Sequence, residues 1–392
     1  MAVNNMTKEQ AYTLISAIHS QATGSASLTP TSTADFISVA QATLAAGYEN
    51  TLNAITQVIQ RTIIAVRPYD AKFTGLEMTA DAWGGIIRKL NYADRGPVAD
   101  EVHTTVDGVP VDQYVVRKPV LLETRYVGSD VYEGYYTIYR DQLKTAFNSE
   151  ANFGSFMTGL MTHFLNERTQ WFEDLKRSLL MNAIGAVIYI NNSESVVHLL
   201  TEYNTLTGAS PAFTAQTIMQ PANFKPFMEW CFSRVAQVSR LFTERSELFQ
   251  QRITGVPINR HTPVADQRVY MDATFLEQMD AMVLADTYHD NFLRYADVEG
   301  VSYWQAIDSP RSVSVTPVYV DGTGAVTTGN AVAETDVVGI IFDRDALGYN
   351  IYNDTLDASP FNAAGKYYNL FAHADVQLQM DVTEKMCVFL LD

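Results

Sequence analysis

The sequence has few cysteines, no long apolar run and no segment that reads as a secretion signal. Only two of its 392 residues are cysteines, Cys231 and Cys387, and neither stands in a paired motif. This excludes a disulfide-stabilised scaffold and predicts two free, buried thiols in a reducing compartment. No apolar run approaches the ~20 residues that span a bilayer, so we expect no membrane partner. The first residues lack the basic and then apolar pattern of a signal peptide, which predicts a protein that stays in the cytoplasm where it is made.

Positive charge is also scarce. The 27 Lys and Arg residues stand against 44 Asp and Glu residues, and the formal net charge is -17. Tight binding to nucleic acid is therefore not expected, because the neutralisation of phosphates needs clustered cations. An acidic surface keeps a concentrated protein soluble, and it would let DNA slide past rather than adhere.

Motifs of catalysis are missing as well. The sequence contains no GxxxxGK[ST], no GxGxxG after a strand, no GxSxG and no HExxH, and its seven histidines are scattered singly. Two acidic pairs, Glu123 with Asp130 and Asp343 with Asp345, could serve acid and base chemistry. The sequence around them shows no pattern that indicates a binding pocket. The best candidate group for binding a hard cation is Asp286, His289, Asp290 and Asp297. We interpret this group as a solvated helix end and loop. We therefore expect no catalytic residue, cofactor or metal.

The N-terminal 75 residues are predicted to form an arm. Helical periodicity covers residues 8–19, and a stretch rich in Ser, Thr, Gly and Pro follows at residues 21–33. Apolar residues then recur at helical spacing through residues 33–59. This alternation of helix, loop and helix is typical of an extended arm.

Residues 76–145 are predicted to be β structure built around a long hairpin. Asp107 and Gly108 stand between the β-branched residues Val106 and Val109, which is a strong signal for a hairpin turn. The tip is too polar for a core, so it is expected to reach a neighbouring subunit, with Asp107, Gly108, Val109 and Tyr114 at the interface. Tyrosines gather at the root of the hairpin, where packing on a neighbour is favoured over the stacking of carbohydrate or bases: Tyr126, Tyr132, Tyr135, Tyr136 and Tyr139.

The strongest helical pattern runs over residues 152–184, with Asn152 as the expected N-cap and Gly185 as the expected stop. At 1.5 Å per residue such a helix is about 50 Å long, and it needs a surface on which to lie. Leu160, Phe164 and Leu175 occupy apolar positions of this helix. They are expected to be buried against the β structure at the end of the chain.

The remainder is predicted to be a mixed α/β region followed by a terminal sheet. The α/β region is expected to include a strand at residues 186–190, a helix from 223 or 226 to 249, a helix at 273–284 and strands within 313–332. Strands recur from residue 337 to 392, and a loop at residues 353–365 interrupts this terminal sheet. The fold class is therefore α+β.

The order of these elements resembles the fold shared by the major capsid proteins of tailed phages and herpesviruses. The resemblance implies an N-arm at residues 1–75, an E-loop hairpin at 76–145 and the spine helix of the P-domain at 146–190. It further implies an A-domain at 191–336 and the terminal P-domain sheet, with its P-loop, at 337–392. Two short stretches resemble capsid proteins of small short-tailed phages with protein-primed replication: LKTAFNSEANFGSFM at residues 143–157 and YYNLFAHADVQL at residues 367–378.

This resemblance implies a structural protein of the virion, assembled in the host cytoplasm into an icosahedral shell that encloses double-stranded DNA. The expected partners are further copies of the chain, as hexamers and pentamers, a scaffolding protein and a portal, with only weak non-specific contact to the DNA. The chain departs from better-known members in having no obvious cleavable scaffolding segment before the N-arm, which leaves open whether a separate scaffolding protein acts. The alternatives are an encapsulin-type nanocompartment shell of the same fold and a soluble hydrolase with an unrecognised acidic site.

Overall fold

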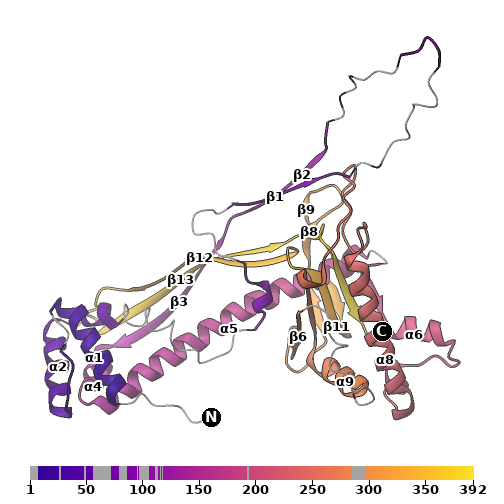
Figure 1. The fold of residues 1–392 in the computed structure, drawn as a ribbon. Helices are drawn as coiled ribbons and strands as arrows, with labels where there is room; N and C mark the ends of the chain where they lie inside the picture. The colour runs from indigo at the N-terminus through magenta and orange to yellow at the C-terminus, as the bar shows by residue number, and fades with distance from the viewer. Residues whose placement is uncertain are drawn as a thin grey trace.

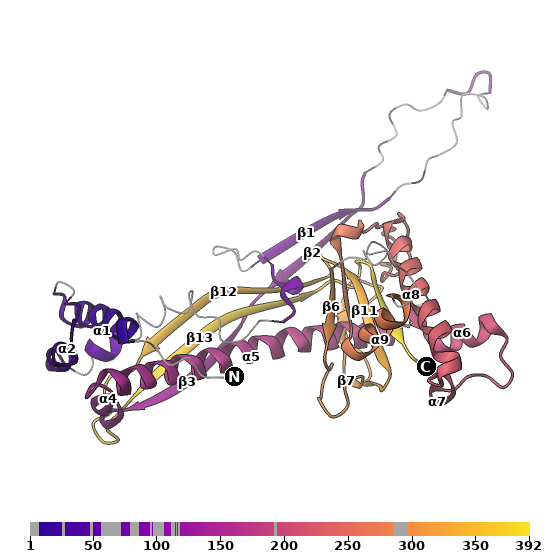
Figure 2. The same cartoon turned by 60° about the horizontal axis from the view of Figure 1, so that its bottom comes forward.

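The computed structural model describes most of the chain: residues 8–25, 28–47, 50–55, 72–78, 86–94, 96, 106–110, 114, 116, 118–191, 194–284 and 297–392. The described residues form an elongated body, from which a two-stranded hairpin projects (Figure 1). One long helix, α5 (Glu150–Ile190), runs through the body and joins a helical cluster at one end to a five-stranded sheet at the other (Figure 2).

Helix α5 spans Glu150–Ile190, 41 residues, and is therefore about 60 Å long. The hydroxyl of Ser149 accepts a hydrogen bond from the Asn152 amide at 3.2 Å and caps the first turn. The helix ends at Asn191, whose backbone is left-handed with a φ of 47°. The predicted helix is correct, but the N-cap predicted at Asn152 and the stop predicted at Gly185 are wrong.

Gly185 lies inside α5, at the point where a short strand packs closely against the helix. A Cβ atom at Gly185 would lie 2.3 Å from Cγ1 of Val315, in strand β7 (Val313–Val315). The glycine therefore allows close packing and does not end the helix. The strand predicted at residues 186–190 is also wrong, since these residues form the last turns of α5. A short apolar run does not distinguish a buried helix from a buried strand.

A three-stranded antiparallel sheet lies along α5 in the order β12-β13-β3. Its strands are Leu347–Ala358, Tyr367–Met380 and Asp130–Tyr139. The predicted interruption at residues 353–365 is shorter in the structure, because residues 353–358 continue β12 and only residues 359–366 connect it to β13. Strand β3 comes from the segment predicted to be hairpin and pairs with β13 over its full length.

A five-stranded mixed sheet has the order β4-β14-β11-β5-β6. Its strands are Val196–His198, Met386–Leu390, Val337–Asp343, Gln267–Asp272 and Asp297–Val301. The prediction of one terminal sheet over residues 337–392 is therefore wrong. β11 and β14 belong to the five-stranded sheet, whereas β12 and β13, which lie between them in the chain, belong to the three-stranded sheet.

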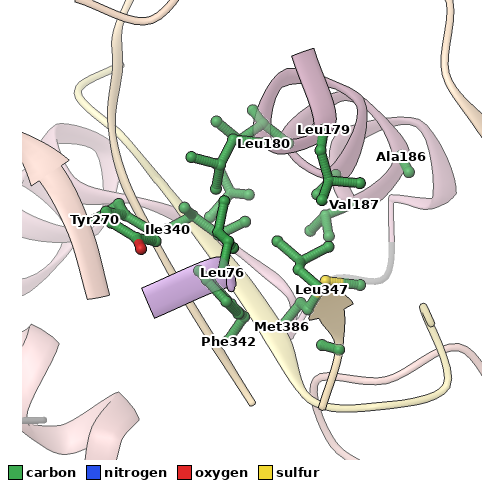
Figure 3. Packing of buried hydrophobic residues seen from close by; sticks show 14 of the residues in the cluster. Leu76, Leu179, Leu180, Ala186, Val187, Tyr270, Ile340, Phe342, Leu347 and Met386 are labelled. Atoms are coloured by element: carbon green, nitrogen blue, oxygen red, sulfur yellow. The ribbon is translucent and has the colours of Figure 1, made fainter. Parts of the chain in front are cut away.

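Both faces of the five-stranded sheet are covered. Along β14, Met386 and Val388 point toward α5, whereas Cys387 and Phe389 point toward helices on the other face. On the α5 side, Leu179, Leu180 and Val187 of the helix meet Ile340, Phe342 and Met386 of the sheet (Figure 3). The other face is covered by three helices: α6 (Leu199–Thr207), α8 (Pro221–Thr243) and α9 (Ala273–Leu284).

The helix predicted at residues 273–284 is present as α9, but α8 ends earlier than predicted. The Lys385 ammonium is fully buried and donates to the carbonyl oxygen of Glu244 at 2.7 Å, just past the end of α8. A cation at this end of a helix is favourable, because the last carbonyl oxygens have no partners within the helix. The remaining elements are short: η1 (Thr74–Leu76), α4 (Arg140–Ala146), α7 (Ala215–Ile218), η3 (Val264–Asp266), β8 (Val318–Val320), β9 (Val326–Thr328) and β10 (Val332–Glu334).

The N-terminal helices pack onto the body, so the expectation of an extended arm is wrong for the described residues. Helices α1 (Lys8–Thr23) and α2 (Thr33–Ala45) and the helical residues 50–55 surround the first turns of α5. Phe36 lies 5.7 Å from Phe153, ring centroid to centroid, and both side chains are buried. Leu160 is buried in the same cluster, which also contains Leu356 of β12 and Leu370 of β13.

We predict that Leu160→Ala lowers the free energy of unfolding of the unassembled subunit by about 2–5 kcal/mol, because it leaves a cavity in this cluster. Urea unfolding followed by circular dichroism measures the change. The control is Leu206→Ala, since the Leu206 side chain is 68% exposed and its loss should cost no more than about 0.5 kcal/mol. An equal effect of the two substitutions would contradict the packing of α5.

Candidate assembly interface

The root of the projecting hairpin is a two-stranded ribbon with two distinct faces. Strand β1 (Ile86–Tyr92) pairs antiparallel with β2 (Leu121–Val127) over seven residue pairs. Residues directly opposite each other in such a ladder point to the same face. Ile87, Lys89 and Asn91 lie opposite Tyr126, Thr124 and Leu122 on the face toward the body, here called the inner face. The other residues form the outer face.

The outer face carries exposed apolar side chains and a charged group. Leu90, Tyr92, Leu121 and Val127 are between 47% and 67% exposed. The Glu123 carboxylate accepts hydrogen bonds from Nε of Arg125 and from Nε of Arg88, both at 2.7 Å. These bonds, with that of Arg125 the stronger influence, lower the pKa of Glu123 to about 2. The face therefore carries a net positive charge on a strongly acidic chain.

The tip of the hairpin contains the predicted turn. The Val109 amide donates to the Val106 carbonyl at 3.1 Å, and Gly108 has a φ of 80°. Asp107 is not in the left-handed region, so the turn is not the type I′ turn that an Asp-Gly pair favours. The predicted interface residues Asp107, Gly108, Val109 and Tyr114 are all exposed. The described turn at residues 106–110 lies far from the body (Figure 1).

A second exposed surface lies on the three-stranded sheet. Strand β3 is an edge strand, and no other described strand pairs with its outer edge. Its side chains alternate: Tyr132, Tyr136 and Ile138 point toward α5 or its neighbours, whereas Tyr135 and Val131 are 75% and 67% exposed. A long edge strand with apolar side chains and neither Lys nor Pro is a template for association.

A groove of about 340 Å³ lies beside this edge strand, between β3, β13 and α5. It is lined by Tyr135 and Tyr136, by Phe164 and Trp171 of α5, and by the charged residues Glu133, Glu167 and Arg168. The predicted spine residues Phe164 and Leu175 are only half-buried, and they contact two different core clusters. Leu160, Phe164 and Leu175 therefore do not form a single buried patch, because α5 is longer than any one of the elements that pack against it.

The five tyrosines predicted to meet a neighbour divide into two groups. Tyr126, Tyr132 and Tyr136 pack within their own chain, for example Tyr132 against Trp171 at 4.9 Å between ring centroids. Tyr135 and Tyr139 remain exposed on the sheet. The ring of Tyr139 also lies 6.2 Å from that of Tyr367, and Tyr136 lines the groove, so Tyr135, Tyr136 and Tyr139 are placed to contact another molecule.

The acidic pairs are occupied by structural contacts. Glu123 is held by two arginines, and Asp343 accepts hydrogen bonds from Thr262 Oγ1 at 2.6 Å and from the Asp345 amide at 2.8 Å. Asp286, His289 and Asp290 lie outside the described residues. Elsewhere in the described chain no group of three or more His, Cys, Asp and Glu side chains could hold a metal ion. None of the described helices is long and apolar enough to cross a membrane.

Sequence reasoning missed the way in which the hairpin is attached to the body. Lys89 on the inner face of the ribbon pairs with Asp381 at 2.8 Å and also with Glu384. A charged residue inside an otherwise half-apolar strand was the available signal. Its partners lie almost 300 residues later in the chain, so no local pattern could identify them.

The comparisons with known proteins agree on one kind of protein. The family model described as Phi29-like phage major capsid protein matches residues 15–390. No curated protein matches the sequence.

Two solved structures share the fold. The capsid structure of Staphylococcus phage Andhra aligns with a TM-score of 0.55 at 11% identity and covers 83% of this chain and 87% of that one. A chain in the structure of the head fibre and inner core protein gp22 of native bacteriophage P68 aligns with a TM-score of 0.54 at 12% identity, covering 82% and 85%.

We predict that the Glu123 carboxyl titrates at a pKa of about 2, rather than at its ordinary value of 4.5. A lowered carboxyl pKa means that the charged group on the outer face is fully formed above pH 4.5 and is lost only as the pH falls through about 2. NMR titration of the side-chain carboxyl carbon measures this pKa. Arg125→Gln should raise it toward 4.5, whereas Arg344→Gln should leave it unchanged. A parent value near 4.5 would show that the arginines do not hold this carboxylate.

Proposed function

Because the chain belongs to the Phi29-like phage major capsid protein family, we infer that its function is structural: copies of it form the shell of a phage head. We propose that the shell is icosahedral, that its copies are arranged as hexamers and pentamers, and that it encloses double-stranded DNA. A scaffolding protein and a portal are the further proposed partners. We also propose that the chain has no turnover chemistry of its own.

The observation that carries the proposed mode of assembly is the hairpin. Its outer face and tip expose apolar side chains that no described part of the same chain covers, including Leu90, Tyr92 and Val109. Burying such side chains against a neighbour is favourable, at about 25 cal/mol for each Å² of apolar surface removed from water. We propose that the hairpin lies on a neighbouring copy at every lateral contact of the shell.

We further propose that the family's part names apply to the elements of this chain. The hairpin of β1 and β2 corresponds to the E-loop. Helix α5 with the sheet β12-β13-β3 corresponds to the P-domain, and residues 359–366 correspond to its P-loop. The five-stranded sheet with α6, α8 and α9 corresponds to the A-domain, and the segment before residue 76 corresponds to the N-arm.

The alternatives have less support. The matched family is one of phage capsid proteins, so an encapsulin-type nanocompartment shell is not favoured. A hydrolase would need acidic groups free to react, and the two candidate pairs contain a carboxylate that other side chains hold in ion pairs or hydrogen bonds: Glu123 and Asp343.

We predict that replacing residues 97–113 by a short Gly-Ser linker leaves the subunit folded but stops shell formation. The melting temperature should stay within a few degrees of the parent, because the removal of a long surface insertion changes loop entropy little. Assembly should fail because the lost contact recurs at each lateral interface of a closed shell. Calorimetry measures the first effect, and negative-stain microscopy of particles from co-expression with the neighbouring genes measures the second.

The matched control is Asp107→Asn, which keeps both the length of the hairpin and a favourable turn pair. It should assemble as the parent does. Unfolding of the deletion variant would mean that the segment belongs to the core. Shells formed by the deletion variant would mean that the hairpin is not the contact between subunits.

The acidic charge of the chain generates a further prediction about DNA. The purified subunit should bind duplex DNA only weakly, and the binding should weaken further as salt is added, since few cations are available to displace counterions. Fluorescence anisotropy over a range of salt concentrations measures both properties. Nanomolar binding at physiological salt would contradict a shell whose contact with DNA is non-specific.

A further inference from the structure

The inner face of the ribbon rests on a buried group of charges in the turn between β13 and β14. The Lys89 ammonium from β1 lies 2.8 Å from Oδ2 of Asp381 and also pairs with Glu384. Arg260, from the loop after α8, lies 2.6 Å from Oε1 of Glu384. The side chains of Asp381 and Glu384 are only 3% and 7% exposed. These four residues, the anchor cluster, combine two cations with two carboxylates.

Further hydrogen bonds join the cluster to both strands of the ribbon. Arg260 donates to the carbonyl oxygen of Thr383 at 2.8 Å and to Oδ1 of Asn91, in β1, at 3.2 Å. The Tyr126 hydroxyl of β2 is hydrogen-bonded to Asp381, and burial together with this carboxylate raises the pKa of Tyr126. Since β1 and β2 both bind to the same turn, the ribbon cannot rotate about its own axis without breaking these bonds.

A second attachment lies just past the end of β1, at Asp94. The Asn259 amide donates to Oδ2 of Asp94 at 2.6 Å, and the Asp94 amide donates to the Pro257 carbonyl at 2.7 Å. Arg245 also pairs with the Asp94 carboxylate. Asp94 follows Lys89 by five positions along the chain, which corresponds to about 17 Å of extended backbone.

Two attachments at this separation fix the direction of the ribbon relative to the body, whereas a single attachment would allow the ribbon to pivot. We propose that the anchor cluster and Asp94 are positioning residues of the shell: they set the angle at which the hairpin leaves the subunit, and through it the geometry of the contact between copies. This inference rests on the proposed function of the hairpin. The ion pairs suit this role because paired charges have directional partners, while apolar contacts alone do not specify an angle.

The test measures the direction of the ribbon in the isolated subunit. Leu121→Cys, at the distal end of the ribbon, and Glu277→Cys, on α9, are exposed sites for spin labels, and the native Cys231 and Cys387 are buried. Double electron-electron resonance then gives the distribution of distances between the labels. The parent should give one narrow distribution, and Lys89→Met combined with Asp94→Ala should lose it.

A second variant distinguishes the loss of the anchor from misfolding of the subunit. Lys89→Met with Asp381→Asn removes one charge of each sign, keeps the pair of Arg260 and Glu384, and leaves an amide oxygen that can accept the bonds now made by Thr383. It should keep the thermal unfolding of the parent, broaden the distance distribution and yield shells of irregular size or shape. The control is Arg234→Met with Glu202→Gln, which removes a pair of similar geometry at 2.6 Å far from the ribbon along the chain. It should change neither readout.

Two results would overturn the inference. One is an unchanged narrow distribution in both anchor variants. The other is a broadened distribution accompanied by shells identical to those of the parent. Neither result bears on whether the hairpin is the contact between subunits, which the replacement of residues 97–113 tests separately.

Discussion

The rest of the structure depends on the burial of one long helix by several different partners. Helix α5 has 41 residues, and a helix in water gains most of its stability from packing rather than from intrinsic propensity. Its first turns are covered by α1, α2 and the three-stranded sheet, and its last turns by the five-stranded sheet. The helix therefore joins two separate hydrophobic clusters as a rigid rod. The two ends of the subunit keep a defined spacing, which a building block of a closed shell needs.

Charged side chains of this helix hold the segment of residues 72–78. Arg177 donates to Glu173 at 2.8 Å, and its guanidinium lies 3.9 Å from the ring centroid of Tyr303 and 5.1 Å from that of Phe73. Lys176 pairs with Glu77. Phe73 and Glu77 belong to residues 72–78, the described segment that precedes the hairpin. Residues 72–78 are thus held by α5, and the ribbon of β1 and β2 is held by the turn after β13.

The surfaces that one copy leaves exposed agree with a function in assembly. The outer face of the ribbon, the tip of the hairpin and the edge strand β3 all present apolar side chains, among them Leu90, Val109 and Tyr135. A subunit with a net charge of -17 repels its own copies at long range, so these short-range contacts have to overcome that repulsion. The exposed arginines around Glu123 lower the repulsion locally, at the place where the proposed contact forms.

The sequence by itself determined the elements that depend on local patterns. The periodicity around Leu160 predicted the long helix, the pair Asp107 and Gly108 predicted a turn, and the order of elements identified the fold. Only the tertiary structure decided where α5 begins and ends, because Gly185 is explained by its contact with Val315 and not by its neighbours in sequence. For the same reason, the sequence could not predict the division of residues 337–392 between two sheets or the pairing of Lys89 with Asp381. Strand partners and buried ion pairs join residues distant in the chain, and their energy appears only when packing brings them together.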